Sequence, residues 1–167
     1  MTVLQRGPSP LPPGASPDRP HLTELRLSAF GRHRGLTLPL GPLTVLSGPS
    51  GSGKTSVLRA LEALARLGGG ASLPEVFPDP GAYVPERARP DGQQRRGFRI
   101  GCTVEGPAGP VRLDLAVQAE PELRVVGERL TGPDVRYLET ALRDPGRRDV
   151  QAAWHTAGSV PVTRGPL

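Results

Sequence analysis

The sequence predicts an α/β fold in which short β-strands and one helix are followed by a mostly antiparallel β-meander. An apolar run from Leu43 to Leu46 leads into a Gly/Ser-rich loop and then into helical periodicity that ends near Leu67. Before this run, apolar and polar residues alternate over two short stretches, and from Phe98 onward the alternation returns. The 167 residues are enough for one domain of this kind.

The two ends of the chain differ in composition from its middle. Residues 1–21 hold six prolines between Pro8 and Pro20 and few apolar residues, so we predict a disordered, Pro-rich tail. Residues 157–167 have turn composition, and we expect an irregular end there. The predicted folded unit is therefore residues 22–156.

This unit is predicted to begin with two strands joined by a short turn. Apolar and polar residues alternate over 22–30, in a strand that ends near Phe30. A turn at 31–35 leads to a second alternating strand over 36–40. Because Pro39 cannot donate a backbone hydrogen bond, this second strand is expected at the edge of a sheet.

The loop after Leu46 carries a phosphate-binding motif. Gly48, Gly53, Lys54 and Thr55 satisfy the spacing G-x-x-x-x-G-K-[ST], the Walker A pattern, between a strand and a helix. Glycines let the backbone turn its N–H groups inward, and the start of the helix adds the positive end of its dipole. We predict that eight residues bind the nucleotide: Gly48, Ser50, Gly51, Ser52, Gly53, Lys54, Thr55 and Ser56.

Two residues of the motif have specific predicted roles. Lys54 is the single lysine among 21 basic residues, the others being arginine. A compact ammonium group suits a crowded phosphate pocket better than a planar guanidinium, so Lys54 is the predicted catalytic contact to the β- and γ-phosphates. The Thr55 hydroxyl is the predicted Mg²⁺ ligand.

The helix is predicted over 55–67 and is followed by a long loop. Glycines 68–70 end the helix, and residues 68–97 are rich in Gly, Pro and Arg without periodicity, so little regular structure is expected there. The apolar face of the helix is expected to comprise Val57, Leu58, Leu61, Leu64, Ala65 and Leu67.

The long loop contains four candidate phosphate contacts. They are either a solvated charge run or contacts to nucleic acid or nucleotide phosphate: Arg87, Arg89, Arg95 and Arg96.

The rest of the folded unit is predicted to be an antiparallel meander. Alternation over 98–104, 111–117 and 123–130 indicates three strands separated by turns. Two further strands are predicted over 137–142 and 150–154.

The segment from the first strand to the helix resembles the start of the ATP-binding-cassette-like heads of the RecF and SMC group of P-loop ATPases. In that group a first strand ends in Phe plus a basic residue, as Ala29-Phe30-Gly31-Arg32 does here, and the helix beginning Ser56-Val57-Leu58-Arg59-Ala60-Leu61 is also similar. The resemblance covers residues 22–67 and departs at Ser50, where many members carry Asn. It implies ATP and Mg²⁺ as ligands, an N-terminal lobe over 22–156, and a head-to-head homodimer of the full-length protein. Phe30 then either covers the base or ribose or belongs to the core.

Two elements of those heads do not occur in the sequence. There is no second apolar strand ending in Asp, which would hold Mg²⁺ and activate water, and no Leu-Ser-Gly-Gly signature. Asp114, on an alternating strand, is predicted to face solvent instead. We therefore interpret the chain as the N-terminal part of an ATPase that binds Mg-ATP and hydrolyses it only with a C-terminal half.

Other functions also fit the loop. Gly48-Pro49-Ser50-Gly51 resembles the guanylate kinase loop, which favours a nucleoside monophosphate kinase, and a nucleotide-binding module without catalysis is a third reading. The net charge of +5 suits an anionic partner, so nucleic acid is a candidate partner besides ATP. Cys102 is the single cysteine, and no run long enough to span a membrane or to act as a signal peptide occurs, so we expect a cytoplasmic protein.

Overall fold

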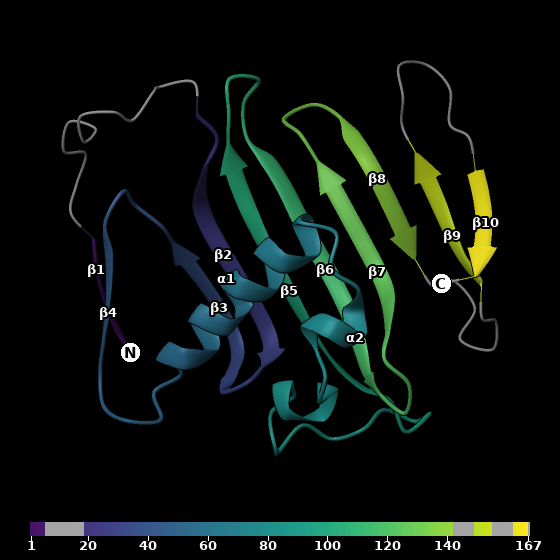
Figure 1. The fold of residues 1–167 in the computed structure, drawn as a ribbon, viewed down its shortest axis with the longest axis horizontal. Helices are drawn as coiled ribbons and strands as arrows, with labels where there is room; N and C mark the ends of the chain where they lie inside the picture. The colour runs from purple at the N-terminus through teal and green to yellow at the C-terminus, as the bar shows by residue number, and fades with distance from the viewer. Residues whose placement is uncertain (6–18, 142–148, 155–161, 167) are drawn as a thin grey trace.

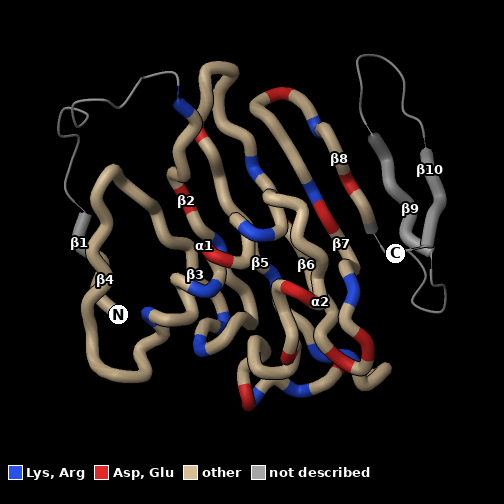
Figure 2. Tube along the Cα trace, in the orientation of Figure 1, with Lys and Arg blue, Asp and Glu red and all other residues tan. Residues whose placement is uncertain are grey.

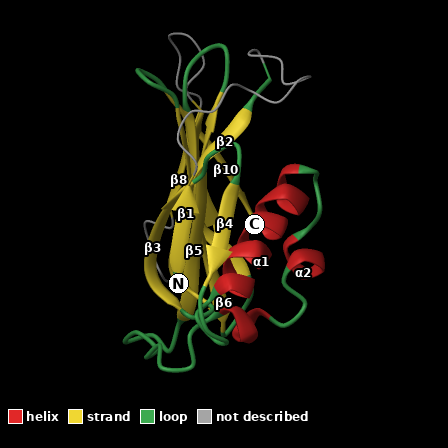
Figure 3. Ribbon diagram, turned by 90° about the vertical axis from the view of Figure 1, so that its left-hand side faces the viewer, coloured by secondary structure: helices red, strands yellow, loops and turns green. Residues whose placement is uncertain are grey.

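The computed structural model describes residues 1–5, 19–141, 149–154 and 162–166, and its main element is an antiparallel sheet with helices on one face (Figures 1 and 3). The sheet has eight strands in the order β10-β9-β8-β7-β6-β5-β2-β3, and a separate two-stranded sheet pairs β1 with β4. The elements of the first half are β1 (Thr2–Gln5), β2 (His21–Phe30), β3 (His33–Pro39), β4 (Thr44–Ser47), α1 (Lys54–Gly68), α2 (Leu73–Val76) and the 3-10 helix η1 (Pro80–Tyr83). Those of the second half are β5 (Arg96–Glu105), β6 (Val111–Glu120), β7 (Arg124–Thr131), β8 (Arg136–Ala141), β9 (Asp149–Trp154) and β10 (Val162–Pro166).

The predicted first two strands are present, and β3 forms an edge of the larger sheet, as Pro39 indicated. In β2 the alternation places Leu25 and Leu27 on the face that α1 covers, where they are fully buried. The turn between the strands is shorter than expected, with β3 beginning at His33. Gly31, at a φ of 56°, takes the left-handed conformation that this tight turn requires.

The predicted meander is also present. Strands β5 to β9 follow one another as antiparallel neighbours, close to the expected ranges. One expectation for the C-terminal end was wrong, because Val162–Pro166 form strand β10 and pair with β9. Turn composition carries no information about a neighbouring strand whose backbone groups are available for pairing.

The N-terminal end also departs from the prediction. Residues 2–5, expected to belong to a disordered tail, form β1 and pair with β4, in the register Val3 to Leu46. These residues precede the prolines and include β-branched side chains, so they can add a strand to the open edge of β4. Residues 6–18, which contain most of the prolines, lie outside the described part of the chain.

The long loop over 68–97 is more structured than predicted. It contains α2 and η1, and Phe77 is fully buried, together with Val76 and Val84. The ring of Phe77 packs edge-to-face against Tyr83 and against Phe98 of β5, at centroid distances of 5.0 and 5.1 Å. Isolated apolar residues of this loop thus close one end of the core. Because they follow no helical or strand period, periodicity in the sequence does not reveal them.

Helix α1 lies over β2 and β5 with a face that matches the predicted one in part, because Val57 is buried and three further predicted residues are partly buried against the core: Leu61, Leu64 and Leu67. The buried residues are Val57, Ala60 and Ala63, whereas Leu58, expected in the core, is 59% exposed. The small side chains of Ala60 and Ala63 allow the helix to approach the sheet closely. Ala65 was also assigned to the apolar face and is exposed.

Candidate functional site

The candidate site is the loop between β4 and α1. Three of its glycines have positive φ: Gly48 at 143°, Gly51 at 77° and Gly53 at 94°. These conformations are strained for other residues, and they bend the loop into a compact turn. A Cβ at Gly48 would lie 3.1 Å from the Ser52 hydroxyl and 3.3 Å from the Cα of Met1, so this position also lacks space.

The first turn of α1 offers unfilled hydrogen-bond donors. Lys54, Thr55 and Ser56 begin the helix, so their N–H groups have no acceptor one turn earlier, and the first bond of the helix is donated by Val57 to the Gly53 carbonyl, at 3.2 Å. No side chain caps this end, and no acidic residue lies in the first turn. Such a helix start favours an anion.

The side chain of Lys54 folds back over the loop. Its Nζ donates hydrogen bonds to the carbonyls of Gly48, at 2.7 Å, and Pro49, at 2.9 Å, and it lies 3.5 Å from the Ser52 hydroxyl. The ammonium group therefore lies among the loop residues at the helix start. Lys54 thus has hydrogen-bond partners within the loop in addition to any phosphate.

The turn between β2 and β3 supports the loop from one side. The Nε2 of His33 donates a hydrogen bond to the Gly53 carbonyl at 3.0 Å, which assigns the proton to Nε2. A Cβ at Gly53 would lie 2.6 Å from the Cε1 of His33, and one at Gly31 would lie 2.9 Å from the Ser56 Cβ. Sequence reasoning missed this contact, because the two segments are twenty residues apart and neither carries a motif for it.

A cleft of about 830 Å³ lies over the loop. Ser50 through Ser56 line one part of it, the turn after β2 lines another, and residues 82 and 84–87, in and after η1, line a third. A backbone hydrogen bond of 2.6 Å from Gly31 to the Tyr83 carbonyl connects the last two parts. The basic residues that line the cleft are Arg32, Arg34, Lys54, Arg59 and Arg87, and the one acidic residue among its described lining is Glu86.

Phe30 is not in this cleft. It is 1% exposed and packs in the core against Phe98, edge-to-face at 5.1 Å, and against Tyr83. Of the two roles considered for Phe30, the structure supports the core and not a cover over base or ribose.

The arginines of the long loop have different surroundings. Arg87 lines the cleft, whereas Arg95 pairs with Asp91 at 2.8 Å and Arg96 with Glu120 at 3.1 Å. The hydrogen bonds that Arg95 donates to Asp91 lower the pKa of that carboxyl to about 2. Arg95 and Arg96 therefore have structural partners.

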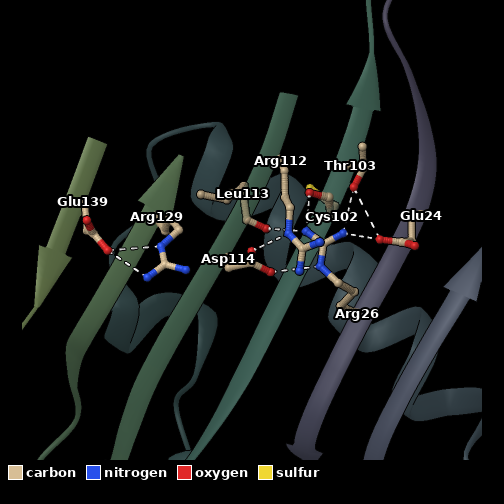
Figure 4. Close-up of polar contacts among 9 residues, drawn as sticks. All are labelled: Glu24, Arg26, Cys102, Thr103, Arg112, Leu113, Asp114, Arg129 and Glu139. Atoms are coloured by element: carbon tan, nitrogen blue, oxygen red, sulfur yellow. Dashed lines mark hydrogen bonds and ion pairs between the residues drawn. The ribbon is translucent and has the colours of Figure 1, made fainter. Parts of the chain in front are cut away.

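The open face of the larger sheet, opposite α1, carries a network of ion pairs (Figure 4), and Figure 2 marks the charged positions along the strands. Arg26 reaches across β5 to donate to Asp114 of β6 at 2.9 Å, and to the carbonyls of Cys102 and Leu113 at 2.9 and 3.1 Å. Gly101 leaves room for this, since a Cβ there would lie 2.6 Å from the Asp114 carboxylate.

Asp114 is therefore not simply solvent-facing, as the alternation suggested. It also accepts a hydrogen bond from Arg112 at 2.7 Å. Burial opposes ionisation of Asp114, but the hydrogen bonds from Arg112 and Arg26 outweigh it and hold the pKa of this carboxyl below its usual value. Its role is to bridge two arginines.

Residues 24–72 are similar to a known protein family. A family model described as an AAA domain matches this segment, which runs from β2 through the loop and α1. An OLD nuclease of Thermus scotoductus is 46% identical over 41 residues, which is 25% of this chain and 8% of that protein. No solved structure matches the chain. The two matches support a P-loop ATPase of the AAA type and do not single out the RecF and SMC group.

None of the helices in the described ranges is both long and apolar enough to cross a membrane. Nor do the described residues contain a group of three or more His, Cys, Asp or Glu side chains that could hold a metal ion.

Proposed function

We propose that the chain binds Mg-ATP through Gly48 to Ser56 and forms the N-terminal part of an ABC-like ATPase of the RecF and SMC group. One observation carries the proposal. The first helical turn with its unfilled N–H groups, two of the three positive-φ glycines, Gly51 and Gly53, and the Lys54 side chain all line one cleft. This combination suits a polyphosphate chain.

Different groups of the loop contact the phosphates and the metal ion. The N–H groups of the loop and of the first turn of α1 donate hydrogen bonds to the phosphate oxygens, and Lys54 moves from the loop carbonyls to the β- and γ-phosphates. Thr55 is exposed at the cleft and supplies one hydroxyl oxygen, which fits Mg²⁺ held mainly by phosphate oxygens and water. When bound, the metal ion would neutralise part of the phosphate charge.

Catalysis needs groups that this cleft does not provide. Hydrolysis requires a carboxylate or amide that orients water and further polar groups beyond the γ-phosphate. Among the described lining residues the one carboxylate is that of Glu86, which is exposed and follows η1. We propose that the full-length protein supplies the missing groups from its C-terminal half and from a second head in a head-to-head homodimer.

The test is a titration of the chain with ATP, with and without Mg²⁺. We expect saturable binding, and we expect Thr55→Ala to weaken the dependence of affinity on Mg²⁺ while binding persists. Absence of ATP binding by the folded chain would contradict the proposal. Transfer of phosphate from ATP to GMP or AMP would favour the nucleoside monophosphate kinase instead.

A further inference from the structure

Two groups of arginines in this protein differ in their partners. Six of them form ion pairs with carboxylates within 4.0 Å: Arg26, Arg95, Arg96, Arg112, Arg129 and Arg136. The four arginines that line the cleft over the loop have no such pair with any described residue, and all four are exposed. The carboxylates near the loop are thus too few to neutralise its basic residues.

The charge of the cleft is large. Five basic residues and one acidic residue line it, which gives a net formal charge of +4. The positive end of α1 adds to this. A nucleoside triphosphate carries roughly four negative charges near neutral pH, and a bound Mg²⁺ offsets about two of them, so the cleft attracts the phosphate chain with or without the metal ion.

The four arginines surround the loop from different elements. Arg32 and Arg34 come from the turn after β2 and from β3, Arg59 from the second turn of α1, and Arg87 from the segment after η1. The hydrogen bonds from Gly31 to Tyr83 and from His33 to Gly53 hold the backbone beside Arg32 and Arg34 in place. Fixed backbones with unpaired, exposed guanidinium groups leave these side chains free to contact an anion in the cleft.

The cleft has little that can recognise a base. Its described lining contains no aromatic side chain and no side-chain amide, and Phe30 and Tyr83 pack with the core aromatic residues instead. Aromatic stacking and the paired hydrogen bonds that a side-chain amide makes to a base edge are therefore absent from the described walls.

Resting on the proposed function, we infer that the cleft selects its ligand by the charge and length of the polyphosphate chain, largely without regard to the base. Arg32, Arg34, Arg59 and Arg87 act as phosphate-binding residues in addition to the loop and Lys54. The ligand class is then nucleoside triphosphates of any base, with inorganic tripolyphosphate as the minimal member.

The test is competition on the 167-residue chain, with a fluorescent ATP analogue displaced by unlabelled ligands in buffer with Mg²⁺. We expect ATP, GTP and inorganic tripolyphosphate to compete within about threefold of one another, because they present the same charge to the cleft. ADP should bind about tenfold more weakly and AMP more weakly still, a tenfold step corresponding to about 1.4 kcal/mol.

Charge-removing variants provide the second measurement. Arg32→Gln and Arg87→Gln should each weaken tripolyphosphate binding about tenfold, and the double variant about a hundredfold if the two contacts act independently. Arg99→Gln is the matched control, because Arg99 is also exposed and forms no ion pair with a carboxylate of the described residues, but lies on the opposite face of the sheet. Its affinity should equal that of the parent chain, and circular dichroism should show all variants folded.

The outcomes separate this inference from the proposed function. If ATP binds and tripolyphosphate does not compete, or if the folded Arg32 and Arg87 variants bind tripolyphosphate like the parent, the inference is overturned and the proposed function stands. If neither ATP nor tripolyphosphate binds the folded chain, both are overturned.

Discussion

The cleft over the phosphate loop and the open face of the sheet are both rich in arginine, but the two regions differ in whether carboxylates pair with these arginines. On the sheet, Arg26 and Arg112 share Asp114, and Arg129 pairs with Glu139 on the next strand (Figure 4). In the cleft the arginines have no carboxylate partner among the described residues. Positive charge that is compensated within the chain contributes to the fold, whereas uncompensated charge gathered over a phosphate loop is available to a ligand.

The largest predicted effect is the absence of ATP hydrolysis by the purified chain. Because the carboxylates of the described residues lie mainly away from the cleft, the purified chain should bind Mg-ATP without turning it over. A steady-state phosphate-release assay on monodisperse protein measures this. Turnover on the order of 1 per second, typical of enzymes, that is lost in Lys54→Ala would refute this expectation and would require a catalytic carboxylate within the chain.

Lys54→Ala should weaken ATP binding in the cleft and leave the stability of the fold nearly unchanged. Loss of a charge-assisted phosphate contact costs about 2 kcal/mol or more, so the Kd for ATP should rise about thirtyfold or more. The free energy of unfolding should fall by less than about 1 kcal/mol, because the lost bonds to the Gly48 and Pro49 carbonyls are exposed. Isothermal titration and urea unfolding give the two values, and unchanged affinity would contradict the assignment of the loop.

Arg26→Ala should produce the opposite pattern. Its side chain is 12% exposed and bonds to two backbone carbonyls and to Asp114, so its loss should lower the free energy of unfolding by about 2 kcal/mol. ATP affinity should stay within error, because the network lies on the face away from the loop. The control is Arg99→Ala, because Arg99 is an exposed arginine on that same face with no ion pair to a carboxylate in the part of the chain that the structure describes. A large loss of ATP affinity in Arg26→Ala would show that the two regions are coupled.

The smallest predicted effect is the pH dependence of the sheet network. The pKa of Asp114 is lower in the folded protein than its ordinary value, so its contribution to stability is fully present above about pH 5 and is lost as the pH falls through the folded-state pKa. Because the carboxylate is about one-third exposed, solvent screening keeps this contribution below about 1 kcal/mol. Urea unfolding at pH 7 and pH 3 should show a larger loss for the parent than for Asp114→Asn, and an equal loss in both would contradict the assigned shift.

Local patterns predicted much of this molecule. The alternation in β2 and in β5 to β7 follows from one buried face, so it is visible in the sequence without knowledge of the partners. The motif at Gly48 to Thr55 is equally local, because adjacent residues build the turn and the helix start.

The features that were missed depend on contacts between distant segments. The pairing of β1 with β4 joins residues 39 to 45 positions apart, and the contact of His33 with Gly53 joins two separate segments. The prediction that Leu58 lies on the buried face of α1 was wrong. Close packing of the helix on the sheet selects the small residues Ala60 and Ala63, whatever the hydrophobicity of their neighbours. Phe77 was missed because a single buried ring has no period.

The position of β1 has a practical consequence for the study of this protein. Pairing with β4 brings the Cα of Met1 to 3.3 Å from the point where a Cβ on Gly48 would lie (Figure 1). A purification tag fused ahead of Met1 would therefore emerge beside the phosphate loop. A polyhistidine tag there would place titratable imidazoles, and any nickel ions that they retain, next to the site under measurement. Affinities should be compared before and after its removal.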